Sequence, residues 1–236
     1  MTTTSIATTG RAASTRSIAD RARFAAVRLI PAAVLVWALL AGLGYLLTRQ
    51  VEHTAFARWD LSVDRWFVGK RTRSWNTDTQ VGSHLAATVA VIIVGVILFF
   101  ALRVILGRWR ESVFVAITLI GAVIIFGCTT LVISRARPDV AHLDSSPPTS
   151  SFPSGHMAAA VTLYGAIAIV IWVASRQVWL RAIATVLAIA VPIAVAFSRL
   201  YRGMHFPTDV LGGALLGVLW LSATALVLLR DRDGPD

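Results

Sequence analysis

The sequence predicts an all-α, polytopic membrane protein with six transmembrane helices, and three observations support this fold class. Of the 236 residues, 56% are hydrophobic and only 14% are charged, whereas soluble domains carry about a quarter charged residues. Six apolar runs meet or approach the roughly 20 residues that a helix needs to cross the hydrocarbon core of a bilayer. The arginines lie mainly in the gaps between those runs. A soluble helical core supplies one or two such runs but hardly six, so we expect a membrane-embedded chain.

The six apolar runs follow one another along the chain. Their expected bounds are Leu29–Leu47, Leu85–Leu102, Val113–Ile133, Met157–Ala174, Ala182–Phe197 and Val210–Leu229. The fifth run is short and contains Pro192, but neighbouring helices can satisfy the backbone carbonyl that a proline leaves free. All six runs are therefore interpreted as membrane spans.

The segments outside these runs define the domain organisation. Residues 1–28 are rich in Thr, Ser, Ala and Arg, which predicts a disordered basic cytoplasmic tail. Residues 29–230 are expected to form one six-helix membrane domain, and residues 231–236 a short cytoplasmic tail. The segment Arg49–His84 holds three tryptophans among charged residues, and indole rings settle at membrane interfaces. This segment predicts a short amphipathic helix at the outer interface.

The charge distribution bears on both orientation and partners. The net charge is +10, yet the chain has no basic stripe interleaved with aromatic residues, which argues against nucleic acid as a partner. The arginines that share one predicted side are Arg11, Arg16, Arg21, Arg23, Arg28, Arg103, Arg108, Arg110, Arg176, Arg181, Arg230 and Arg232. The positive-inside rule therefore places both termini in the cytoplasm of a cell-membrane protein. The single cysteine, Cys128, excludes an intramolecular disulfide and a cysteine-based metal cage.

Three polar clusters fall between the later apolar runs, all on the side opposite the termini. They are Ser134–Pro138 after the third run, Pro153–His156 before the fourth, and Ser198–Asp209 between the fifth and sixth. Charged residues at helix ends commonly extend to the interface, so none of the clusters is informative by itself. Their combination predicts one site at the outer face of the membrane.

These clusters contain the parts that phosphoryl transfer needs. Arginines present planar forks of donors that match phosphate oxygens. Ser154 and Gly155 precede a predicted helix, and helix N-termini bind anions through their free N–H groups. His205 and Asp209 are four residues apart, so they share one face if the segment is helical. A carboxylate so placed holds the proton of one imidazole nitrogen and leaves the other nitrogen free to attack. His156, in a different loop, can protonate the leaving oxygen.

The same residues resemble the signature of a known family. Arg137-Pro138, Pro-Ser-Gly-His at 153–156, and Ser-Arg-(five residues)-His-(three residues)-Asp at 198–209 resemble the three motifs of the type 2 phosphatidic acid phosphatase superfamily. That superfamily includes lipid phosphate phosphatases, soluble bacterial acid phosphatases and vanadium haloperoxidases. The motif resemblance extends from Thr130 to about Gly213, and the six-span layout is similar to the membrane branch.

The resemblance implies a role for each motif residue. His205 would form a phosphohistidine intermediate, Asp209 would orient it, and His156 would protonate the leaving group. The residues that would hold the phosphoryl oxygens are Arg137, Ser154, Gly155 and Arg199. No metal and no cofactor is implied, because arginines supply the positive charge that a metal would otherwise bring.

One position departs from the family pattern. Thr130 stands where the first motif usually begins with a lysine. A missing cation weakens phosphate binding by about 1.5–3 kcal/mol if nothing compensates for it. Arg135 and Arg202 are the candidate substitutes, each of which would bring a further guanidinium to the phosphate.

The predicted activity is hydrolysis of a phosphate ester or anhydride of a lipid that enters the pocket laterally from the outer leaflet. Candidate substrates are a polyprenyl diphosphate such as undecaprenyl diphosphate, phosphatidic acid and phosphatidylglycerophosphate; an outward-facing site favours the isoprenoid diphosphate. Two alternatives remain open: a transferase that passes the phosphoryl group to an alcohol, and a weakly catalytic protein that binds lipid phosphates. Apart from the substrate and the bilayer no partner is predicted, and the sequence does not specify an oligomeric state.

Overall fold

The six predicted membrane spans are present in the structure, a computed structural model that describes residues 18–51, 53–146 and 148–230. This part of the chain forms helices and loops and contains no strand. The helices that are long and apolar enough to cross a membrane are α1 (Ile18–Tyr45), α4 (Thr88–Leu106), α5 (Arg110–Val132), α6 (Gly155–Ala174), α7 (Val178–Tyr201) and α8 (Pro207–Leu228). The predicted all-α fold with six transmembrane helices is confirmed.

The start of α1 differs from the sequence prediction. Residues 18–28, which the sequence assigns to a disordered tail, form the first turns of this helix. Alanine and arginine both have high helix propensity, and a polar composition does not stop a helix that continues into a membrane span. The rest of that predicted tail, residues 1–17, and the predicted tail at 231–236 lie outside the described residues.

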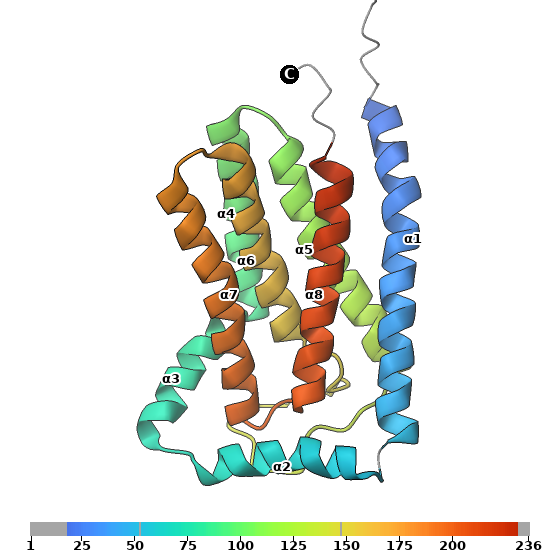
Figure 1. Cartoon of the computed structure of the whole chain (residues 1–236), viewed down its shortest axis with the longest axis vertical. Coiled ribbons are helices and arrows are strands. Elements are labelled where there is room, and N and C mark those ends of the chain that lie inside the picture. Colours follow the sequence, from blue (N-terminus) through green and yellow to red (C-terminus); the bar gives the residue numbers. More distant parts are fainter. Residues whose placement is uncertain (1–17, 52, 147, 231–236) are drawn as a thin grey trace, which may run out of the picture.

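Two helices, rather than the one short helix predicted, follow α1. A π-helical turn (Leu46–Gln50) extends α1 and leads to α2 (Ala55–Gly69) and α3 (Arg73–His84). α2 lies across one end of the bundle (Figure 1). Its exposed aromatic side chains are Phe56, Trp59 and Trp66. Its opposite face buries two carboxylates, Asp60 and Asp64, so α2 is amphipathic in an unusual way, with acidic groups turned toward the protein.

Small residues allow α6 and α8, the most buried of the six spans, to pack closely. A Cβ atom added at Gly213 would collide with the backbone carbonyl of Ser154, and one added at Gly217 would lie 2.6 Å from Cβ of Val161. The close approach brings the loop before α6 against the first turns of α8. Two of the three polar clusters are adjacent for this reason.

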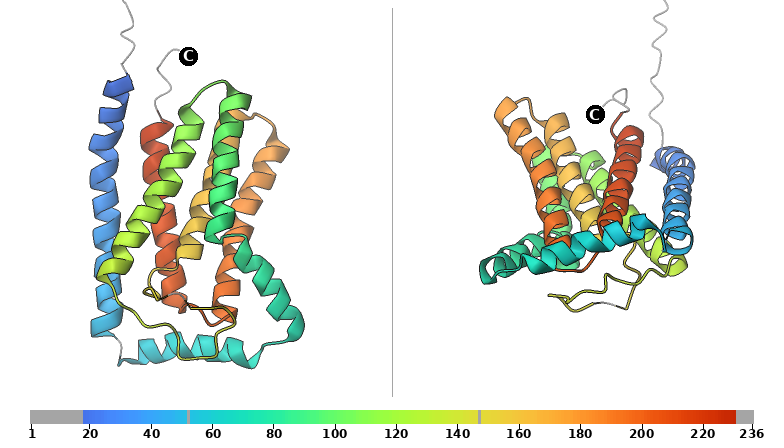
Figure 2. Two further views of the ribbon diagram at one scale, coloured as in Figure 1. Left: turned by 180° about the vertical axis from the view of Figure 1, so that it is seen from behind. Right: turned by 60° about the horizontal axis from the view of Figure 1, so that its bottom comes forward.

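All three polar clusters gather at the end of the bundle that α2 covers. The connection from α5 to α6 runs across this end, next to the α7–α8 loop (Figure 2). The first turn of α1 and the last turn of α8 lie at the opposite end (Figure 1). The polar clusters therefore lie at one end of the bundle, and the start of α1 and the end of α8 lie at the other end.

Candidate active site

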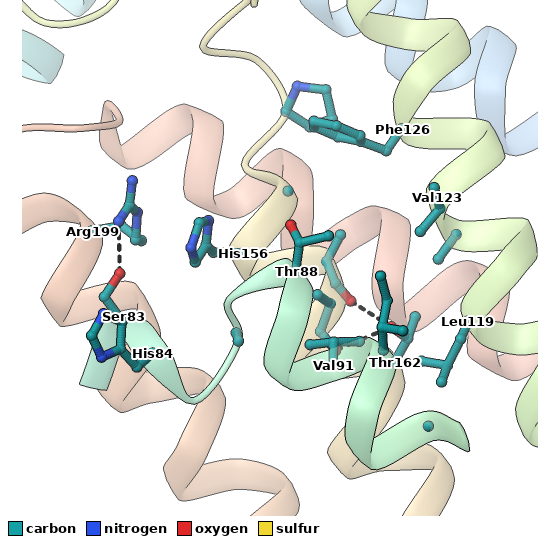
Figure 3. A pocket seen from close by; sticks show the side chains of 18 of the residues that line it. Ser83, His84, Thr88, Val91, Leu119, Val123, Phe126, His156, Thr162 and Arg199 are labelled. Carbon is teal, nitrogen blue, oxygen red and sulfur yellow. Dashed lines mark hydrogen bonds between the residues drawn. The ribbon is translucent and has the colours of Figure 1, made fainter. Parts of the chain in front are cut away.

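A pocket of about 920 Å³ begins at the polar clusters and extends between α4, α5 and α6. Its polar end is lined by Arg137, Gly155, His156, Arg199 and His205. The lining side chains farther along it are mostly apolar. Figure 3 shows His156 and Arg199 on one side of the pocket and the apolar side chains of α4 and α5 on the other. A volume of this size is typical of sites for small molecules.

His205 lies in the short loop between α7 and α8. Gly203, with a φ of 71°, allows the chain to turn tightly after α7. Nδ1 of His205 donates a hydrogen bond to the carbonyl oxygen of Ser151 at 2.8 Å. Because a carbonyl oxygen only accepts, the proton resides on Nδ1 and the lone pair on Nε2. Burial lowers the pKa of His205, so the imidazole is neutral at physiological pH, which is the form a nucleophile requires.

Asp209 supports His205, although the geometry differs from the expectation. Its Oδ2 lies 3.7 Å from Nδ1 of His205, farther than the Ser151 carbonyl. The same oxygen accepts a hydrogen bond from the backbone N–H of Phe206 at 3.0 Å, and Oδ1 binds Arg135 at 2.5 Å. His205 precedes α8 rather than sharing a helix with Asp209. The carboxylate therefore acts both as an electrostatic neighbour of the imidazole and as a cap of α8.

The start of α6 contributes to the polar end of the pocket, which His205 also lines. Ser154 is fully buried. Its hydroxyl oxygen caps α6 by accepting a hydrogen bond from the backbone N–H of Met157 at 3.5 Å. The backbone N–H of Ser154 donates to the carbonyl oxygen of Asp209. Ser154 is outside the pocket lining, whereas Gly155 and His156 belong to it. The N–H groups of the first helical residues have no partner within the helix. The backbone N–H groups of Gly155 and His156 are therefore the helix-end donors that belong to residues of the pocket lining.

Two arginines, the buried Arg199 and the partly buried Arg137, carry the positive charge of the pocket. Arg137 donates through one terminal nitrogen to the carbonyl of Met204 at 2.7 Å, and Arg199 donates to Oγ of Ser83 at 2.7 Å. The Nε atom of each guanidinium is buried and has no hydrogen-bond partner within the described part of the chain. A buried, unpaired donor costs free energy unless a ligand satisfies it. Each of the two guanidinium groups therefore retains a donor that the described residues leave unsatisfied.

Arg135 and Arg202, the predicted substitutes for the family lysine, are engaged elsewhere. Arg135 forms ion pairs with Asp60 and Asp209, and Arg202 forms a bidentate pair with Asp144. Neither arginine belongs to the pocket lining. The expectation that they contact the phosphate rested on residue type and on position, since Arg135 is two residues before Arg137 and Arg202 lies within the third motif. In the structure, carboxylates that are distant in the sequence bind both guanidinium groups.

Asp144 is a site residue that the sequence did not identify. It lines the pocket and accepts hydrogen bonds from both Arg199 and Arg202. Burial alone would raise the pKa of Asp144, but the two guanidinium groups more than offset this, so its pKa lies below the usual range. Asp144 therefore stays ionised and holds one side of the Arg199 guanidinium.

α3 also contributes side chains that the sequence did not identify. Ser83 accepts the Arg199 hydrogen bond that Figure 3 shows, and His84 lies at the rim of the same pocket. Both precede Arg199 by more than a hundred positions, and no motif marks them. Thr130 is not part of the pocket lining; its hydroxyl donates to the carbonyl of Gly127 in α5.

Together, the fold and the site define a class: a multi-pass membrane protein with two arginines and two histidines around one pocket at one end of the bundle. Within the described residues, no group of three or more His, Cys, Asp or Glu side chains is arranged to hold a metal ion.

Comparisons with known proteins identify the family. A family model described as the PAP2 superfamily matches residues 111–233, more than half of the chain. Phosphatidylglycerophosphatase B of Bacillus subtilis (strain 168) is 43% identical over 94 residues, which cover 37% of this chain and 43% of the relative. An undecaprenyl-diphosphatase of Sulfolobus acidocaldarius is 30% identical over 141 residues, which cover 57% of this chain and 63% of the relative. This chain belongs to the PAP2 superfamily.

The fold agrees with a solved member of the family. The crystal structure of a transmembrane PAP2 type phosphatidylglycerolphosphate phosphatase from Bacillus subtilis superposes with a TM-score of 0.73 at 23% identity, and the match covers 88% of this chain and 99% of that one. The matched segments of the two curated relatives span about half of their lengths. α1, α2, α3 and α4 precede the residues that the family model matches.

Proposed function

We propose that this protein is a lipid phosphate phosphatase that hydrolyses a phosphate ester or anhydride through a phosphohistidine formed on His205. One observation carries the proposal: a single pocket joins an anion-binding end with two histidines to an apolar groove between α4 and α5. A substrate that fills both ends has a phosphorylated head and a long hydrocarbon chain. A membrane lipid phosphate is a molecule of this kind.

The polar end suits the charge that develops during phosphoryl transfer. Arg137 and Arg199 supply guanidinium donors, and the first N–H groups of α6 add backbone donors. Donors fixed before the reaction stabilise the transition state without reorganising. The two arginines supply the cationic stabilisation, and we therefore propose a reaction that does not depend on a metal ion.

The reaction proceeds in two steps. Nε2 of His205 attacks the phosphorus atom. The bond from phosphorus to the leaving oxygen breaks as His156, which is protonated while the anionic substrate is bound, gives that oxygen its proton. The new phosphorus–nitrogen bond is then cleaved by water, whose proton returns to His156. Asp209 and the carbonyl of Ser151 hold the Nδ1 side of His205 throughout. Phosphate leaves, and both histidines recover their starting protonation.

The apolar end suits a substrate that enters from the bilayer. Ile92, Phe100 and Ile120 line the pocket, yet each is about 60% exposed on the surface of the bundle (58%, 60% and 60%). The groove therefore opens sideways, toward the lipid that surrounds the spans. A lipid tail can occupy it while the phosphate remains at the arginines.

We further propose that the pocket faces the extracytoplasmic side of the cell membrane. The excess of arginines at the other end of the bundle, including Arg103, Arg108 and Arg181, supports this orientation. An outer-leaflet site suits a polyprenyl diphosphate, phosphatidylglycerophosphate or phosphatidic acid. The relatives named for undecaprenyl diphosphate and phosphatidylglycerophosphate support the first two candidates.

Phosphate release by the purified protein in detergent tests the proposal. The panel contains undecaprenyl diphosphate, phosphatidylglycerophosphate, phosphatidic acid and a water-soluble phosphate ester without a tail. We expect release from at least one lipid to exceed release from the soluble ester by at least about tenfold in kcat/KM, because the tail adds binding energy. Equal rates for the tailed and untailed substrates would contradict a lipid substrate. Formation of a phosphorylated alcohol when glycerol is added would reveal a transferase.

A further inference from the structure

Asp60 is a buried carboxylate on α2, outside the residues that the family model matches. Its exposure is 1%. Oδ1 accepts from the backbone N–H of Thr208 at 3.2 Å, and Oδ2 accepts from the Thr208 hydroxyl at 2.5 Å and from Arg135 at 2.8 Å. Every polar contact of Asp60 therefore goes to residues of the first and third polar clusters. A buried carboxylate is tolerated when it is paired and hydrogen-bonded in this way.

Arg135 continues this network from Asp60 to the site. One terminal nitrogen binds Asp60, and the other binds both Oδ1 of Asp209 and the Thr208 hydroxyl. The guanidinium carbon also lies 4.3 Å from the centre of the Phe206 ring. One guanidinium thus joins α2 to the residues that follow His205. A planar fork suits this task because its donors point in fixed directions.

The position of the nucleophile depends on those residues. Thr208 and Asp209 form the first turn of α8, and Phe206 directly follows His205. Oδ2 of Asp209 accepts from the N–H of Phe206 and lies 3.7 Å from Nδ1 of His205. A shift of the Asp209 carboxylate therefore moves both the backbone next to His205 and the charge beside its imidazole.

We propose that Asp60 is a positioning residue for the nucleophile, holding Asp209 and the first turn of α8 through Thr208 and Arg135. The inference rests on the proposed function of the site. It assigns to α2, a helix outside the bundle, a direct influence on the chemical step. Asp60 contacts neither the pocket nor the arginines that receive the anion, so its loss should impair attack by His205 and leave anion binding nearly unchanged.

We expect α2 to remain attached to the bundle when Asp60 is changed, because neighbouring residues hold it independently. Arg71, just after α2, donates to the carbonyls of Tyr201 and Ala141 at 3.0 and 2.7 Å. The N–H of Thr72 donates to the Tyr201 hydroxyl at 2.8 Å. These contacts are independent of Asp60, so Asp60→Asn should stay folded, and its effect can be separated from a loss of structure.

The test compares the binding of two inorganic anions by purified wild type, Asp60→Asn and Asp78→Asn in detergent. Phosphate reports on the anion site alone, whereas vanadate takes a fifth ligand from the nucleophile and so reports on the position of His205. Asp78 is an exposed carboxylate on α3, and its asparagine variant is the matched control. We expect Asp60→Asn to weaken vanadate binding about tenfold or more, as expected for loss of a charged hydrogen bond, with phosphate affinity within about twofold of wild type.

Three results would overturn the inference: unchanged vanadate binding in Asp60→Asn, an equal loss for both anions, or the same loss in Asp78→Asn. If Asp60→Asn does not fold, Arg135→Lys replaces it, because lysine lacks the two separate terminal nitrogens through which Arg135 binds Asp60 and Asp209. That variant is expected to show the same selective loss of vanadate binding, and wild-type vanadate binding would refute the proposal. Neither readout needs a lipid, so a wild type that binds vanadate but releases no phosphate from lipids would refute the proposed substrate and leave this inference standing.

Discussion

Arg202 provides a sharp test of the site geometry, because residue type and structure predict different consequences of losing it. Its guanidinium forms a bidentate pair with Asp144, with contacts of 2.6 and 2.9 Å. It also donates to the carbonyls of Leu143 and Asn76. The residue is 4% exposed. Arg202 therefore fastens the α5–α6 loop and α3 to the end of α7, and Arg202→Ala should reduce stability rather than phosphate binding.

The magnitude follows from those contacts. Removing one partner of a buried ion pair costs about 3–5 kcal/mol, and the lower part of that range applies because the Asp144 side chain is 28% exposed and keeps Arg199. For a chain of this length 1 kcal/mol shifts the Tm by about 2–4 °C. We therefore expect the Tm of Arg202→Ala in detergent to fall by about 6–12 °C, with KM changed by less than about threefold.

Thermal unfolding and steady-state kinetics on the same preparation measure both quantities. Arg73→Ala, which removes an exposed arginine on α3, is the matched control and should leave the Tm within about 1 °C of wild type. If Arg202→Ala keeps the wild-type Tm and raises KM tenfold or more, Arg202 binds the phosphate directly and the assignment of the phosphate contacts to Arg137 and Arg199 is wrong.

Three further predictions concern stability, metal dependence and orientation. Burial, together with the charges of Asp60 and Asp209, raises the pKa of Asp64 to about 8; the unfolded chain releases this proton near pH 4, so the Tm should fall between about pH 4 and 8. Asp64→Asn should reduce that fall, and an equal fall in both proteins would contradict the buried acid. Phosphatase activity should survive a chelator, whereas loss that one divalent ion restores would show a metal requirement. A cysteine at the exposed Ser146, in a Cys128→Ser background, should react with an impermeant thiol reagent in intact cells; labelling only after lysis would place the pocket in the cytoplasm.

Much of the fold could be predicted from the sequence because membrane spans have a simple physical signature. The length and hydrophobicity of the six runs located every span, including α7 with its internal Pro192. The start of α1 at Ile18 was missed because arginine-rich helix outside the bilayer has the composition of a tail. For residues 49–84 the sequence predicts only one short amphipathic helix, whereas the structure has both α2 and α3 there. This segment is too polar for hydrophobicity to locate the ends of its helices.

The site could be predicted less completely. Five of the motif residues that the sequence places at the reaction centre line the pocket. They are Arg137, Gly155, His156, Arg199 and His205. Arg135 and Arg202 carry the same guanidinium group as Arg137 and Arg199. Only their carboxylate partners, Asp60 and Asp144, distinguish them from the two arginines that line the pocket. Those pairings join positions up to 75 residues apart. No local pattern encodes such contacts, because they arise when α2 and the α5–α6 loop fold across the same end of the bundle.

The most direct test of the central claim is to trap the phosphoenzyme. Purified wild type is mixed with a lipid phosphate that carries a radioactive phosphoryl group, quenched within milliseconds in alkali and digested. We predict an acid-labile, alkali-stable label on the peptide that contains His205, and no label in a folded His205→Ala variant. A label on another residue, or turnover by His205→Ala above a few per cent of wild type, would contradict a phosphohistidine at this position.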